Sequence, residues 1–193
     1  SFKSGSFAWH FGPSFVFNQF ALKEPDGSTN FLSAEQIIIQ LALIPLLEKR
    51  VELTKVELNG ATLSLIRKAD GTLNIDDLLK TDKDAVPVQF SRIIMKKSTL
   101  NWLDLGTTKD GFSASLNNLQ FSIDHLTRGR KGHIALSADL PAIDGPAAHL
   151  SISGTVRLAD LKSSLLNSEL NCDAEIKQAE IGRFWPYYGR FIP

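Results

Sequence analysis

Hydrophobic and polar residues alternate along most of the chain, which is the pattern of β-strands with one buried face. Residues 15–22 alternate with a change of phase near Asn18 and Gln19, as a β-bulge would produce. Residues 37–43 alternate again, after the turn-forming sequence Pro-Asp-Gly-Ser at residues 25–28. This part of the chain therefore predicts two strands joined by a turn.

The next two alternating runs, residues 51–58 and 61–66, are separated by Asn59-Gly60. An Asn-Gly pair between alternating runs is the strongest local signal of a β-hairpin. The first run changes phase at Thr54-Lys55, so a bulged corner within one strand is the alternative. Both interpretations place two strand segments here.

The second half of the chain continues in the same way, with glycine or proline in most gaps between strand-like runs. Such spacing predicts antiparallel β-meanders. Short helices are expected at residues 45–50 and 76–79 and from Ile181 onward, and none is long enough for a βαβ crossover. The predicted strands are residues 89–96, 99–105 with a corner at Lys97-Ser98, 112–123, 132–140, 149–158 and 170–176.

These elements predict a mainly β (α+β) fold: a curved antiparallel sheet, or a half-open sandwich or groove, with a few short helices near the ends. We divide the chain into residues 1–84, a β module with short helices, and residues 85–193, a continuing meander of the same sheet. The two parts are expected to form one continuous structural unit within a longer protein.

The predicted sheet is apolar on one face only, and an apolar face is covered by a second layer or by a ligand. A closed hydrophobic core and an open groove for acyl chains are both compatible with this pattern. Burial of an acyl chain contributes about 0.8 kcal/mol per CH₂, so a lipid site needs no polar motif. The candidate lipid-facing residues share one phase: Phe15, Phe17, Ile37, Ile39, Leu41, Val51, Leu53, Leu63 and Leu65.

Composition excludes several classes of function. Lys plus Arg and Asp plus Glu both number 21, so the chain lacks the basic excess of nucleic-acid-binding proteins. A single cysteine excludes an internal disulfide. No apolar run reaches the 18 residues of a membrane-spanning helix.

No motif indicates catalysis, a cofactor or a metal. The sequence Gly-Phe-Ser-Ala-Ser at residues 111–115 lacks the second glycine of a serine-hydrolase elbow. Asp76 and Asp77 are explained by helix capping. The histidines have no metal-ligand spacing, and Cys172 lies alone in a strand. These histidines are His10, His125, His133 and His149.

Aromatic residues offer a further candidate site. Trp185 and the adjacent Tyr187 and Tyr188 are dense enough to form a platform for stacking sugars, with Trp9 and Trp102 as further members. The alternative is packing at the end of the module, which we favour.

The order of elements from residue 39 to residue 79 resembles the N-terminal region of the AsmA-like family of Gram-negative envelope proteins. The shared phrase is a strand, Asn59-Gly60, a strand ending in the basic Arg67, then Gly-x-x-Asn at residues 71–74 and a short helix. Residues 98–104, Ser-Thr-Leu-Asn-Trp-Leu-Asp, and residues 150–156 match later phrases of the family. The resemblance covers about residues 13–190 and is densest at 37–105.

This resemblance implies a periplasmic protein held at the inner membrane by a helix outside the present sequence. AsmA-like proteins are related to chorein-type, bridge-like lipid-transfer proteins, in which a curved sheet carries lipid in an apolar groove. The implied ligand is a phospholipid moving toward the outer membrane, and the implied role is non-enzymatic, with no cofactor. The alternatives are a scaffold for envelope protein partners, which would use an exposed sheet edge, and a carbohydrate-binding β-sandwich.

Overall fold

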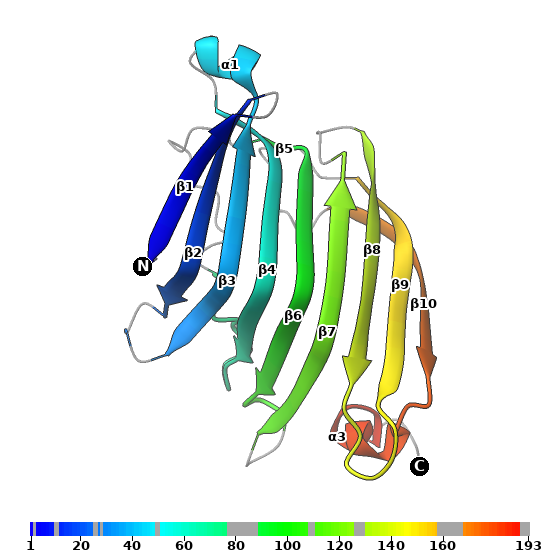
Figure 1. The fold of residues 1–193 in the computed structure, drawn as a ribbon. Helices are drawn as coiled ribbons and strands as arrows, with labels where there is room; N and C mark the ends of the chain where they lie inside the picture. Colours follow the sequence, from blue (N-terminus) through cyan, green and yellow to red (C-terminus); the bar gives the residue numbers. More distant parts are fainter. Residues whose placement is uncertain are drawn as a thin grey trace.

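The computed structural model describes residues 1, 3–9, 12–24, 27, 29–48, 51–76, 89–107, 111–125, 130–157 and 168–189. Its strands form one open, curved β-sheet, and the short helices lie toward the ends of the strands (Figure 1). The predicted mainly β fold with a curved sheet is confirmed, and of the two predicted forms the open sheet is the one observed. The expected boundary at residue 84 falls in the sequence between β4 (Glu52–Arg67) and β5 (Gln89–Phe90) of this sheet, and the division into two parts stays a prediction.

Strand length and order follow the predicted alternation closely. The exception at the N-terminus is β1, which pairs with β2 and was not expected from the sequence. The strands are β1 (Ser4–Trp9), β2 (Pro13–Lys23), β3 (Asn30–Leu41), β4 (Glu52–Arg67), β5 (Gln89–Phe90), β6 (Arg92–Asp104), β7 (Phe112–Asp124), β8 (Lys131–Leu140), β9 (Ala148–Arg157) and β10 (Glu169–Lys177).

The sheet has the order β1-β2-β3-β4-β6-β7-β8-β9-β10, with the short β5 paired to the start of β4. Neighbouring strands are antiparallel except at β4, which pairs in parallel with both β5 and β6. The prediction of meanders throughout is wrong at this junction. Parallel strands need a long connection, and the segment between Arg67 and Arg92 is long enough to provide it.

Asn59-Gly60 does not form a hairpin. Strand β4 runs through it for 16 residues, and Gly60 adopts a left-handed backbone conformation with φ of 57°. The bulged-corner interpretation is therefore the correct one. An Asn-Gly pair signals a hairpin because its residues accept positive φ, and the same property here permits a bend within a single strand. Lys97, at the other predicted corner, likewise has φ of 49° inside β6.

Left-handed residues line up across the sheet. Gln19 of β2, Gly60 of β4, Lys97 of β6 and Asn118 of β7 all have φ between 49° and 57°. The strand registers place them on one transverse line: Gln19 and Gly60 both lie opposite Glu35 of β3, and Gly60 lies opposite Lys97. We call this transverse line the crease.

The crease changes the phase of the side chains. Ala34, Ile37 and Ala61 belong to one hydrophobic cluster, together with Phe17 and Phe20, which lie on either side of Gln19. Residues three apart along a strand would normally point to opposite faces. The left-handed residue between them restores the same face, so the side that carries this cluster continues beyond the crease. We call this side the apolar face.

The opposite side of the sheet, the polar face, carries hydrogen-bonded side chains. The Asn59 amide donates to Gln36, and the Gln36 amide donates to Asn18 (3.3 and 3.2 Å). Glu57 lies between two lysines, with 2.6 Å to Lys96 Nζ and 3.1 Å to Lys55 Nζ. Although burial alone would raise the pKa of Glu57, the two lysines lower it, so this carboxylate is ionised at neutral pH.

The short helices are close to their expected positions. Helix α1 spans Leu43–Leu47, earlier than the predicted 45–50, and the 3₁₀ helix η2 (Ile181–Phe184) and α3 (Trp185–Tyr188) confirm the C-terminal prediction. Of the helix expected at 76–79, only Asp76 is among the described residues. No helix in the described part of the chain is both long and apolar enough to cross a membrane.

Replacement of Gly60 by alanine should destabilise the protein by about 1–2 kcal/mol, because an L-residue in the left-handed region strains its backbone. The added Cβ would also lie 2.6 Å from Cδ of Glu35, which would have to move. Urea unfolding measures the loss. Gly182→Ala is the matched control, since its Cβ would meet nothing within 4 Å and its φ is not positive. Equal stability of the two variants would contradict the requirement for glycine at the left-handed position 60.

Candidate functional site

The candidate lipid-facing residues lie together on the apolar face, with one exception. Phe15 pairs with Ile39, Phe17 with Ile37, and Leu41 with Leu53, and register partners in a sheet share a face. Leu63 and Leu65 continue the same face below the crease, beside Leu100 and Trp102 of β6. Val51 precedes β4, outside any strand, and is 40% exposed. A lipid-binding role for these residues stays a prediction.

The register also shows that the apolar face extends much further than the candidate residues do. Two transverse rows of register partners cross the sheet from β2 to β10, and neither contains a charged residue. The first row is Phe17, Ile37, Leu58, Met95, Phe121, Leu136, Ile152 and Ala174. The second row is Phe15, Ile39, Val56, Ile93, Ile123, Ile134, Gly154 and Cys172.

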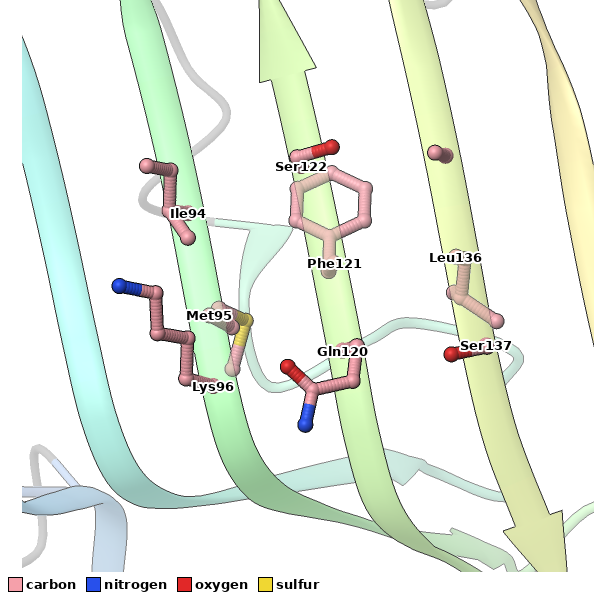
Figure 2. Close-up of a pocket in the computed structure, with 9 residues that line it drawn as sticks. Ile94, Met95, Lys96, Gln120, Phe121, Ser122, Leu136 and Ser137 are labelled. Carbon is pink, nitrogen blue, oxygen red and sulfur yellow. The ribbon is translucent and has the colours of Figure 1, made fainter.

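A depression of about 260 Å³ lies over β6, β7 and β8, along the first row. Figure 2 shows Met95, Phe121 and Leu136 on three adjacent strands. These residues are absent from the candidates predicted above, which extend only to residue 65. The alternation that would have identified them is present in residues 89–96, 112–123 and 132–140.

The apolar face has no second sheet over it, since all the strands that the structure describes belong to one sheet. Among the described residues, the apolar side chains of this single layer are therefore covered mainly by their neighbours in the sheet.

One end of the apolar face is covered by the C-terminal helices. The Tyr187 hydroxyl donates to Asp104 (2.9 Å), and it accepts a hydrogen bond from Nε1 of Trp102 (3.0 Å). The rings of Tyr187 and Phe184 pack on Phe112, with centroids 5.0 and 5.7 Å away. We call these five residues the end cluster, and its place at the ends of β6 and β7 matches the expected packing at the end of the module.

Asp104, the last residue of β6, is fully buried and accepts several hydrogen bonds. Its donors include the Gly106 N–H (2.9 Å), the Arg67 guanidinium (3.1 Å) and the Thr107 hydroxyl. Burial alone would raise the pKa of this carboxyl, but these bonds and that from Tyr187 lower it to about 2. The basic end of β4 and the acidic end of β6, two features of the sequence motif, are thus partners in one ion pair.

The aromatic residues and the aspartates singled out in the sequence lie at separate places in the structure. Trp185 and Tyr188 stack edge to face at 5.4 Å, whereas Trp102 and Tyr187 are hydrogen-bonded to each other within the end cluster. The Asp76 carboxylate accepts the Leu73 N–H, as a turn-capping residue does. Asp77 and His10 lie outside the described residues, as does the side chain of Trp9.

Two of the histidines lie beside an aspartate, a grouping that their spacing in the sequence did not predict. Asp124, His125 and His133 each offer a ligand atom, and these three atoms lie within 4.8 Å of one another. Sequence spacing missed this grouping because the pairing of β7 with β8 brings residues 124 and 133 together.

The family comparison agrees with this architecture. Residues 4–127 match the AsmA family, and because the match covers more than half of the chain, the chain belongs to that family. No curated protein matches it. Membership of the AsmA family indicates an envelope-associated protein.

Asp104→Asn should lower the free energy of unfolding at pH 7 by about 2–3 kcal/mol, because hydrogen bonds to a buried charge are lost. The pKa of Asp104 is lower in the folded protein than in the unfolded chain, so its stabilisation is complete above about pH 4. It is lost as the pH falls toward 2. Denaturant unfolding across this range should show the difference between the two proteins shrinking with acidity.

The exposed Asp144→Asn is the control, and it should leave both the stability and its pH dependence nearly unchanged. A wild-type-like stability of Asp104→Asn at pH 7 would contradict the assigned role of the end cluster.

Proposed function

We propose that this chain is a periplasmic part of an AsmA-family protein anchored in the inner membrane. Its apolar face shields the acyl chains of phospholipids on their way toward the outer membrane, while the headgroups stay in water. The step is physical, and no bond is made or broken. The observation that carries this proposal is the pair of uncharged rows that cross the single-layer sheet from β2 to β10.

The dimensions of the sheet support the proposal. The hydrocarbon core of a bilayer is about 30 Å thick, so one acyl chain needs about 15 Å. Strand β2, with 11 residues, is about 36 Å long at 3.3 Å per residue. The apolar face is therefore longer than an acyl chain along the strands.

The energetics point the same way. A large contiguous apolar face left in water is rare in monomeric proteins and marks an interaction site. Each CH₂ group moved from water onto the face contributes about 0.8 kcal/mol, so two acyl chains supply a large driving force. Contacts of this kind are non-directional, which suits a site that holds lipids and also lets them slide.

Ile39→Asp should reduce bound phospholipid, because it introduces a charge into the second row of the apolar face. Ile38→Asp is the matched control, because Ile38 is the neighbouring isoleucine of the same strand, on the polar face, and its register partner in β4 is the charged Glu57. Native mass spectrometry of the gently purified protein, followed by lipid extraction, measures the bound lipid. Wild type and Ile38→Asp should carry phospholipid, and Ile39→Asp should carry several-fold less.

Circular dichroism and urea unfolding of both variants establish that they remain folded. A lipid-free wild-type mass, with no uptake of an added fluorescent phospholipid, would overturn the proposal. An equal loss of lipid in both variants would place the lipid elsewhere than on the apolar face.

A second candidate function is supported by the free edge of β10. This strand pairs with β9 on one side, has no strand partner on the other among the described residues, and is exposed along its whole length. Its apolar side chains include Leu170, which is 60% exposed. An edge of this kind can accept a strand from an envelope protein partner.

Asp173→Pro should separate the two functions, because proline removes a backbone donor from β10 and obstructs strand addition while leaving the rows of β2 to β9 intact. Loss of partner binding in a pull-down, with phospholipid content unchanged, would support the scaffold. Unchanged partner binding would exclude the β10 edge as the docking strand. Ala147→Pro, outside the strands, is the control for the proline itself.

A further inference from the structure

Two histidines and one aspartate converge where β7 ends and β8 begins. Oδ1 of Asp124 lies 2.9 Å from Nδ1 of His125 and 3.3 Å from Nδ1 of His133. The same oxygen accepts the backbone N–H of His133 at 3.1 Å. One carboxylate oxygen thus faces two imidazole nitrogens at once.

The backbone holds these side chains together. Asp124 and His133 are register partners across β7 and β8, so their side chains share the polar face. His125 has φ of 53°, an uncommon conformation for a residue other than glycine, and it directs the ring back toward Asp124. A side chain at Gly132 would place a Cβ 2.3 Å from the carbonyl oxygen of Asp124, so only glycine allows β8 to approach here.

The spacing of the three groups fits a metal ion. Zinc binds histidine nitrogen and carboxylate oxygen at about 2.0–2.1 Å in tetrahedral geometry, which separates neighbouring ligand atoms by about 3.3 Å. The two Asp124–histidine distances are close to that value, and all three ligand atoms lie within 4.8 Å. The side chains of His125 and His133 are 70% and 69% exposed, so an ion can reach the site and keep water in its remaining position.

The kinds of ligand also indicate which metal the site would take. Two imidazoles and one carboxylate suit zinc and other late first-row dications rather than calcium or magnesium.

We propose that Asp124, His125 and His133 form a binding site for a late first-row transition-metal dication such as Zn²⁺, which clamps the end of β7 to the start of β8. The site is on the polar face, opposite the apolar rows, and it does not depend on the lipid proposal. Bound metal stabilises the folded protein by mass action, because the unfolded chain does not bring the three ligands together.

Zinc titration of the whole chain by isothermal calorimetry at pH 7.5 tests the site. The exposed Cys172 is replaced by serine in all proteins, because a free thiol also binds zinc. One equivalent of Zn²⁺ should bind and should raise the melting temperature. His133→Ala and His125→Ala should each weaken zinc binding at least about tenfold and abolish the thermal shift.

The pair of His149 and Asp139, toward the other end of β8, provides the matched control. His149 Nδ1 lies 2.9 Å from Asp139 Oδ1, but no third ligand joins this pair among the described residues. His149→Ala should bind zinc like the parent protein. Both altered histidines of the proposed site are exposed, so circular dichroism should show unchanged folding. The proposal is overturned if the parent binds no zinc, or if His149→Ala weakens binding as much as His133→Ala does.

Discussion

The alternation of side chains along a β-strand is the constraint on which this structure depends. A strand of 11 to 16 residues keeps one face apolar only if its sequence alternates without error or its backbone corrects the error. Here the backbone corrects it. Gln19, Gly60, Lys97 and Asn118 each take a left-handed conformation where the phase of the sequence changes. Because these residues lie at one level of the sheet, the correction bends the sheet along one line instead of disrupting separate strands.

The same constraint explains what could be predicted. Strands β7 to β10 begin and end within one or two residues of their predicted positions, because alternation and turn residues mark them directly. The change of phase at Asn18 and Gln19 was visible in the sequence, and it marks the crease. At Asn59-Gly60 the sequence could not decide between a hairpin and a bend, because positive φ serves both. Pairing with β3 and β6 on either side keeps the segment in one strand.

Contacts between distant residues were the part that alternation could not predict. The convergence of Asp124, His125 and His133 depends on the register of β7 and β8, and the ion pair of Arg67 and Asp104 depends on the parallel pairing of β4 and β6. The extent of the apolar face is an intermediate case. Its phase was correct for β2, β3 and β4, but its continuation to β10 required the register of every strand pair.

The parallel pairing of β4 with β6 also bears on how the chain folds. In an antiparallel hairpin the partners nearest the turn are close in sequence, so pairing can spread outward from the turn. In a parallel pair every partner has the same separation, which for Leu58 and Met95 is 37 residues. No short loop can start this pairing, and closing long loops slows folding. We therefore expect two meanders, β1 to β4 and β6 to β10, to form first and to join along this seam in the slowest step.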